Sequence, residues 1–221
     1  MGKLFEIWIV PPLIAAACLV GCAGEASPPQ GATGTVADSA EKVHSIAVGQ
    51  TVPAVTLRTV GGQLYDLRRG IARQPTVLIF YRGGWCPYCN RHLAELQELE
   101  PKLRELGYQI LAISPDRPEE LAKSVRKQSL GYTLLSDSDM TAARAFGLAF
   151  RVDDALVGLY KTKYSIDLEA ASGRKHHELP VPAAYIVDQS GKIRHAYVNP
   201  DYKARIEPEK LLQEARSALA K

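Results

Sequence analysis

The sequence of 221 residues has little of several things, and each scarcity excludes a class of protein. Four cysteines are too few for a disulfide-built scaffold of this length. Charge of one sign is barely in excess, because 27 Lys and Arg stand against 24 Asp and Glu and no basic run occurs. We therefore expect no nucleic-acid partner. The hydrophobic fraction of 46% and the charged fraction of 23% are ordinary, which excludes a wholly disordered chain.

The amino terminus carries an uncharged run that is short for a membrane span. Lys3 precedes 14 uncharged residues, 7–20, whereas a spanning helix needs about 20 apolar residues. This pattern is typical of a secretory signal peptide. The run ends in Leu19-Val20-Gly21-Cys22, which resembles the lipobox of bacterial lipoproteins. The resemblance implies a lipoprotein signal peptide over 1–21, lipidation of Cys22, and a protein exported to the bacterial cell envelope and anchored to a membrane. A plain cleaved signal is the alternative.

Residues 22–43 are small, polar and rich in proline and glycine, and they have no hydrophobic periodicity. Such a composition cannot bury enough apolar surface to offset the entropy lost on ordering. We therefore predict a flexible linker over 22–43 and a single globular domain over 44–221.

The globular part alternates strands with helices. Apolar runs and turn signals predict strands at 55–59, 63–66, 76–81, 109–113, 133–135, 184–187 and 192–198. Periodicity and start signals, including an apparent capping box at 116–119, predict helices at about 89–106, 116–128, 140–146 and 208–219. This order predicts an α/β fold with a mixed central sheet flanked by helices. Residues 151–181 are poorly patterned, and we interpret them as an insertion.

A C-x-x-C motif, Cys86 to Cys89, lies where the apolar strand 76–81 ends and an amphipathic helix begins. Backbone amides and the helix dipole at a helix N-terminus favour the thiolate form of a cysteine. A second thiol three residues away can close a disulfide within one helical turn. The motif therefore predicts a redox-active dithiol. Trp85 before it is a residue that can restrict water and hold the turn.

Two alternatives to a redox role remain open. A zinc site would need two further ligands, and His176 and His177 are the only candidate pair. A structural disulfide is plausible outside the cytoplasm. We expect neither a metal nor another cofactor.

Five segments in a fixed order resemble the peroxiredoxin-like branch of the AhpC/TSA group, within the thioredoxin superfamily. They are FYRGGWCPYCN, LAISPDRPEEL, LLSDSDMTAARAFGL, LPVPAAYIVDQSGKIR and NPDYKARIEP, and the resemblance covers roughly residues 45–219. It implies a thioredoxin-like fold with an N-terminal β-hairpin extension. It also implies an antioxidant thiol oxidoreductase that acts on a peroxide and is regenerated by a thioredoxin-like reductant.

The sequence departs from true peroxiredoxins at the positions that polarise the peroxide. With Cys89 placed on the peroxidatic cysteine, Arg82 replaces the motif proline, Cys86 replaces Thr or Ser, and Pro182 replaces the distant arginine. Pro182 instead resembles the cis-proline that faces the C-x-x-C of thioredoxins. A disulfide substrate therefore stays open. The alternative functions are a protein disulfide reductase outside the cytoplasm and a thiol- or copper-binding module without catalysis.

Several residues near the motif are secondary candidates. Arg82 could stabilise a thiolate or bind a peroxide oxygen, or it could be an exposed structural arginine. His92, one turn after Cys89, is expected to face solvent. Tyr202 and Arg205 are expected to be structural or to support the site from behind, and residues 176–178 are expected to be polar surface.

The two cysteines should have different roles in the reaction. Cys86, at the turn before the helix, should be the more exposed sulfur, and thioredoxin-type exchange gives it the lower pKa. Peroxiredoxin-type chemistry instead makes Cys89 the sulfur that becomes sulfenic acid. From the resemblance, we expect Cys89 to be that sulfur.

Overall fold

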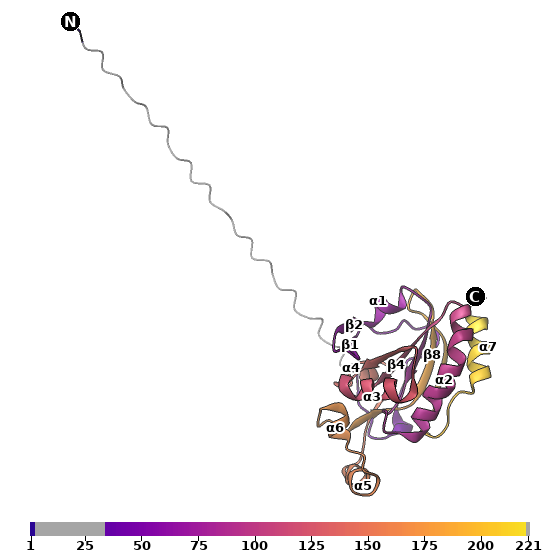
Figure 1. Ribbon diagram of the computed structural model, residues 1–221. Helices are drawn as coiled ribbons and strands as arrows, with labels where there is room; N and C mark the ends of the chain where they lie inside the picture. Colours follow the sequence, from indigo (N-terminus) through magenta and orange to yellow (C-terminus); the bar gives the residue numbers. More distant parts are fainter. Residues whose placement is uncertain (3–33, 220–221) are drawn as a thin grey trace. The chain divides into compact units, whose positions relative to one another are not determined.

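The computed structural model describes residues 1–2 and 34–219 (Figure 1). The predicted signal peptide and Cys22 therefore lie outside the described residues. The chain divides into two units, residues 1–30 and 31–221, and the fold below is that of the second unit. Among the helices described, none has both the length and the apolar character that crossing a bilayer requires.

Ordered structure begins before the predicted boundary at His44. The backbone of Ala37 donates to the carbonyl of Ala149 and accepts from the amide of Arg151, both at 2.9 Å. A short 3-10 helix, η1, follows at Ala40–Lys42. Residues 34–43 therefore belong to the domain rather than to the predicted linker.

A mixed seven-stranded sheet forms the centre of the domain, in the order β2-β1-β5-β4-β3-β8-β9. The central strands β3, β4 and β5 are parallel, β8 pairs antiparallel with β3, and β9 pairs antiparallel with β8. The N-terminal hairpin β1–β2 joins the far edge through β5, as the hairpin extension predicts. The strands are β1 (Thr56–Thr59), β2 (Leu64–Asp66), β3 (Thr76–Phe80), β4 (Gln109–Ser114), β5 (Thr133–Ser136), β8 (Ala183–Val187) and β9 (Ile193–Val198).

Two hydrophobic clusters cover the two faces of this sheet. All of β3 is buried, and its side chains alternate between the faces because successive residues of a strand point in opposite directions. Val77 and Ile79 pack under α2 (Pro87–Glu105), α3 (Pro118–Gln128) and α7 (Pro208–Leu219). Leu78 and Phe80 pack with α1 (Leu67–Ile71) and α4 (Thr141–Ala145). The predicted α/β fold with a mixed, helix-flanked sheet is confirmed.

Helix α2 carries the leucine stripe that the sequence predicts. The buried leucines of the stripe, at about 2 kcal/mol each, fasten α2 to the sheet, and the helix continues past Pro101. In Figure 1, α2 lies beside α7, the last helix. The stripe thus fixes the N-terminus of α2, where the C-x-x-C motif lies, at the end of β3. Its members are Leu93, Leu96, Leu99 and Leu103.

The insertion, residues 151–181, is more regular than its sequence suggests. Strands β6 (Ala149–Arg151) and β7 (Glu178–Pro180) pair as a small antiparallel sheet, and α5 (Asp154–Tyr164) and α6 (Leu168–Ser172) lie between them in sequence. A small third cluster around Val152, Leu168 and Leu179 packs against Trp85 of the C-x-x-C loop. The insertion therefore contacts the predicted active site.

Candidate active site

The two cysteines lie at the N-terminus of α2. Cys86 is the residue before the first helical position, and its carbonyl accepts from the amide of Asn90 at 3.0 Å. Cys89 lies in the first turn, and both cysteines are free thiols. Cys86 is 1% exposed and Cys89 is 0% exposed, so both residues are buried and the predicted difference in exposure is very small. The placement of the motif at a strand–helix junction is confirmed.

The pKa values of the two cysteines are shifted in opposite directions. A hydrogen bond from the Cys89 thiol lowers the pKa of Cys86 to about 6, with the charges of Arg82 and Arg205 adding to the effect against burial. Burial raises the pKa of Cys89 well above its usual value, and the hydrogen bond to Cys86 raises it further. At neutral pH, Cys86 is therefore a thiolate and Cys89 is the thiol that donates to it.

Arg82 follows β3 and is buried beside the motif, at 5% exposure, so its interpretation as an exposed structural arginine is wrong. Its Nη2 donates to the hydroxyl of Tyr160 at 2.6 Å. Its Cζ lies 4.3 Å from the ring centre of Tyr202, 5.2 Å from that of Trp85 and 5.7 Å from that of Tyr160. Three aromatic rings thus hold a buried cation whose charge favours the Cys86 thiolate.

Arg205, in the loop before α7, contacts the second sulfur directly. Its Nη2 lies 3.4 Å from Cys89 Sγ. Its Nη1 donates to the carbonyls of Tyr202 and Ala204, both at 2.6 Å, and these bonds fix the guanidinium. The expectation that Arg205 acts only from behind the site is therefore wrong. Its place in the NPDYKARIEP segment was the one sequence signal for this role.

His92 lies one turn after Cys89 but does not face solvent, contrary to expectation. It is 4% exposed. Burial and the charge of Arg205 lower the pKa of His92 to about 3, so its imidazole is neutral at physiological pH. A neutral, buried His92 adds no charge to the site.

Pro182 lies at the site, but the prediction that it is a cis-proline is wrong. Among the described residues no peptide bond is cis. The carbonyl of Pro182 accepts from the amide of Asn199 at 3.3 Å, which extends the β8–β9 ladder and keeps the chain extended there. Pro182 lines a pocket of about 270 Å³ together with Arg82, Tyr160 and Tyr202.

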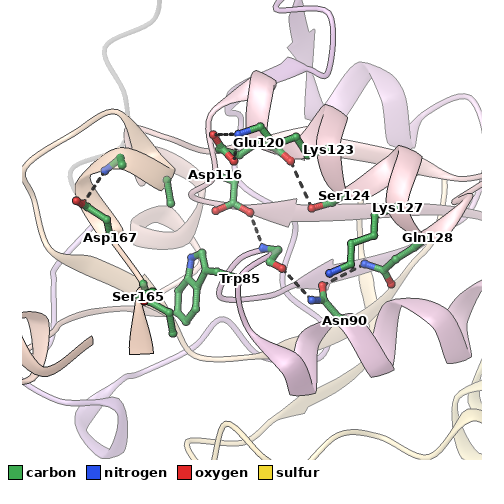
Figure 2. Close-up of a pocket in the computed structure, with 14 residues that line it drawn as sticks. Trp85, Asn90, Asp116, Glu120, Lys123, Ser124, Lys127, Gln128, Ser165 and Asp167 are labelled. Atoms are coloured by element: carbon green, nitrogen blue, oxygen red, sulfur yellow. Dashed lines mark hydrogen bonds and ion pairs between the residues drawn. The ribbon is translucent and has the colours of Figure 1, made fainter. Parts of the chain in front are cut away.

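Asp116 anchors the loop that precedes the motif, a role that the sequence did not reveal. The apparent capping box is wrong, because α3 begins at Pro118 with no side-chain cap. Instead, Asp116 Oδ2 accepts from the amide of Gly84 at 2.6 Å (Figure 2). The carbonyl of Gly84 accepts from Asn90 Nδ2 at 2.8 Å. Burial raises the pKa of Asp116 to about 7, and these bonds hold the loop between α2 and α3.

Gly83 in this loop has to be glycine. Its φ of +146° lies in the range that disfavours side chains. A Cβ placed there would also collide with the Trp85 ring and with Asp116. The loop therefore lets Trp85 and Asp116 approach the backbone closely.

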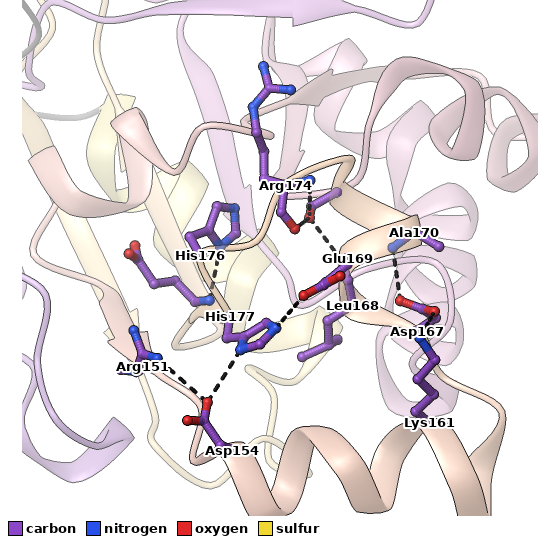
Figure 3. Close-up of polar contacts among 12 residues, drawn as sticks. Arg151, Asp154, Lys161, Asp167, Leu168, Glu169, Ala170, Arg174, His176 and His177 are labelled. Atoms are coloured by element: carbon purple, nitrogen blue, oxygen red, sulfur yellow. Dashed lines mark hydrogen bonds and ion pairs between the residues drawn. The ribbon is translucent and has the colours of Figure 1, made fainter.

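Residues 176–178 are joined into the fold, so their description as polar surface is wrong. His177 lies between Asp154, at 3.4 Å, and Glu169, at 2.9 Å (Figure 3). Glu178 forms a two-pronged pair with Arg144, each contact at 2.8 Å. His176 Nε2 lies 3.0 Å from the carbonyl of Ser138. In residues 34–219 no three His, Cys, Asp or Glu side chains are grouped so as to hold a metal ion.

Comparisons with known proteins place the chain in a family. The model of the AhpC/TSA family matches residues 48–196. A putative peroxiredoxin, bcp, of Haemophilus influenzae is 33% identical over 108 residues, which are 48% of this chain and 68% of the relative. A putative peroxiredoxin bcp of Coxiella burnetii is 30% identical over 128 residues, covering 57% and 84% of the two chains.

Solved structures share the fold. Prx3 of Vibrio vulnificus, crystallised with hydrogen peroxide, superposes with a TM-score of 0.63 at 21% identity, covering 77% of this chain and 99% of that one. A putative thiol:disulfide interchange protein, DsbE, of Chlorobium tepidum gives 0.54 at 18% identity, covering 79% and 99%. With this fold and a paired-cysteine site, the chain belongs to the AhpC/TSA family and is a peroxiredoxin-like, thiol-dependent oxidoreductase of the thioredoxin superfamily.

Proposed function

We propose that this protein is an exported antioxidant peroxidase that reduces peroxides through the Cys86–Cys89 dithiol. The observation that carries the proposal is the coupled pair of sulfurs at the N-terminus of α2, in which Cys89 donates to a Cys86 whose pKa is about 6. A thiolate is the form of cysteine that attacks peroxides. The low pKa favours Cys86 as the nucleophile, in place of the Cys89 that the family resemblance suggests.

The chemistry balances within the dithiol. The Cys86 sulfur attacks one peroxide oxygen, the O–O bond breaks, and the leaving oxygen takes a proton as alcohol or water. Cys86 is thereby oxidised by two electrons to a sulfenic acid. The Cys89 sulfur then attacks the Cys86 sulfur, water leaves, and a Cys86–Cys89 disulfide forms.

Two arginines supply positive charge where the usual peroxiredoxin residues are missing. Arg82 lies beside Cys86, and Arg205 contacts Cys89 at 3.4 Å. A fixed cation stabilises the negative charge that develops on the leaving oxygen and on the Cys89 thiolate. The pair therefore compensates for Pro182, which replaces the arginine of true peroxiredoxins.

Regeneration needs an outside dithiol. We propose a thioredoxin-like reductant, whose thiolate attacks the Cys86–Cys89 disulfide, forms a mixed disulfide and leaves as the oxidised donor. Two electrons pass from the donor to this protein in each cycle.

Rapid mixing tests the peroxidase. The reduced protein and its Cys86→Ser and Cys89→Ser variants are mixed with hydrogen peroxide, and oxidation is followed by quenched thiol counting. We expect a second-order rate well above that of free cysteine for the parent and for Cys89→Ser, and its loss in Cys86→Ser. A parent rate no faster than free cysteine rejects the proposal.

A protein disulfide reductase is the second candidate. The replacement of all three peroxide-polarising positions favours it, since disulfide exchange needs no group that polarises an O–O bond. The same mixing experiment with a model disulfide separates the two functions. Fast reduction of the disulfide together with slow oxidation by peroxide supports the reductase.

We further propose that residues 1–21 are removed as a lipoprotein signal peptide and that lipidated Cys22 tethers the domain to a membrane of the cell envelope. The support is the lipobox-like Leu19–Cys22 segment and the polar residues after it. Each buried CH₂ of an acyl chain contributes about 0.8 kcal/mol to membrane binding. Expressed in a bacterium, the protein should enter the detergent phase, and Cys22→Ala should not. Equal partition of both proteins rejects the anchor.

A further inference from the structure

Helix α5 of the insertion packs on the domain through two partly buried side chains, Val157 and Tyr160, which lie against the cluster around Val152, Leu168 and Leu179. None of its residues is fully buried, and Leu156, Leu159 and Tyr164 are exposed. Polar side chains add further contacts to this packing. Asp154 contacts His177, and Lys161 pairs with Asp167 at 2.8 Å (Figure 3).

One residue of α5, Tyr160, contacts side chains that lie next to the C-x-x-C motif. The hydroxyl of Tyr160 accepts from Arg82 Nη2 at 2.6 Å, and its ring lies 6.1 Å from that of Trp85. In the described part of the chain, Arg82 Nε is buried and has no hydrogen-bond partner. Tyr160 therefore supplies the one hydrogen-bond acceptor found for this buried side chain.

We propose that Tyr160 is a positioning residue that holds Arg82 beside the Cys86 sulfur, so that the insertion helix α5 is part of the active site. The inference rests on the proposed role of Cys86 as the nucleophile. A buried guanidinium that loses its hydrogen-bond acceptor is left with an unpaired N–H group, and contact with aromatic rings does not replace that hydrogen bond. The side chain therefore shifts to find another acceptor. Any such shift moves its charge relative to the sulfur.

A displacement of Arg82 shifts the pKa of Cys86 in a definite direction. Arg82 and Arg205 are the cations that lower the pKa of Cys86, and the thiol of Cys89 lowers it through its hydrogen bond. The charge of Cys86 also contributes to the raised pKa of Asp116, a buried carboxylate in this region. Displacing Arg82 while the other groups stay raises the pKa of Cys86 and reduces its thiolate fraction at acidic and neutral pH.

The test is the pH profile of Cys86 alkylation in Tyr160→Phe, which removes the hydroxyl and keeps the ring. Iodoacetamide labelling of the reduced full-length protein is followed by mass spectrometry of the peptide that carries both Cys86 and Cys89, and fragmentation of that peptide assigns the label to Cys86. We expect labelling of Cys86 at pH 6 to slow about two- to five-fold, which corresponds to a modest rise in pKa. Labelling at pH 9.5 should match that of the parent.

The matched control is Tyr164→Phe, on the same helix but exposed and without contact to Arg82. It should leave the profile unchanged. In an Arg82→Gln background, Tyr160→Phe should have no further effect, because both changes act through one side chain. An unshifted profile in Tyr160→Phe, a slowing of equal size at every pH, or an undiminished effect in the Arg82→Gln background overturns the proposal. Because labelling needs no peroxide, a protein without peroxidase activity would reject the proposed function and leave this result readable.

Discussion

The central sheet and helix α5 of the insertion differ in how much of their surface is buried. Every residue of β3 is buried between two layers of helices, whereas α5 has no fully buried residue and is attached by two partly buried side chains, Val157 and Tyr160, together with polar contacts. Yet both regions reach the same site, because β3 ends at the loop before Cys86 and α5 supplies the hydroxyl that holds Arg82. Stability and chemistry therefore come from different parts of the chain: the sheet fixes where the sulfurs are, and the periphery adjusts their charge.

Substitutions in β3 and in α5 should differ most in their effect on stability. Phe80→Ala in β3 removes a fully buried ring, and we expect it to lower the free energy of unfolding by about 3–5 kcal/mol. Leu159→Ala in α5 removes an exposed side chain and should change it by less than about 0.5 kcal/mol. Urea unfolding measures both. Similar losses of unfolding free energy in the two variants would contradict this difference in burial between β3 and α5.

The next effect is on chemistry. Arg205→Gln removes the cation 3.4 Å from Cys89, and we expect the rate of peroxide-driven disulfide formation to fall about tenfold with little change in the urea midpoint. Arg104→Gln, on the exposed side of α2, is the control and should leave the rate unchanged. An unaltered rate in Arg205→Gln would remove Arg205 from the mechanism.

The sequence predicts the sheet well and the periphery poorly, for a physical reason. Residues 76–81 are apolar throughout because β3 is covered on both faces, and the leucines of α2 repeat because one face is buried. Helix α5 has no fully buried residue and packs through only two partly buried side chains, Val157 and Tyr160, so its sequence carries little periodic signal. Hydrophobic patterns therefore predict the extensively buried elements and miss an element that is only slightly buried.

The site divides in the same way. The C-x-x-C motif was predictable because its spacing and its place at a strand–helix junction are local features. The contact of Arg205 with Cys89 joins residues 116 positions apart, and no local pattern encodes it. Asp116 shows a third case, since its spacing to Glu119 fits a capping box while the structure turns its carboxylate to Gly84.

A smaller effect concerns pH. Burial raises the pKa of Asp116 to about 7 from an ordinary 3.8. The stabilising contribution of a carboxyl with a raised pKa is complete below its unfolded value and is lost as the pH rises through the folded one. The stability of Asp116→Asn relative to the parent should therefore rise by about 1 kcal/mol between pH 4 and pH 5. The exposed Asp201→Asn should show no such trend, and a flat difference for Asp116→Asn would contradict the raised pKa.

The smallest expected effect is local. His177→Gln weakens the link between Asp154 of α5 and Glu169 of α6. Amide hydrogen exchange in α5 should quicken about two- to three-fold while exchange in β3 stays the same, because local opening does not require global unfolding. Equal acceleration in both segments would show that the insertion is not separately anchored.

The most direct test of the whole account is to trap the sulfenic acid. Reduced Cys86→Ser and Cys89→Ser proteins each receive one equivalent of hydrogen peroxide in the presence of dimedone, and the adduct is located by mass spectrometry. The coupled sulfurs predict an adduct on Cys86 in Cys89→Ser and little or none on Cys89 in Cys86→Ser. An adduct on Cys89 alone would contradict the assignment of Cys86 as the nucleophile, and no adduct on either cysteine would contradict the peroxidase itself.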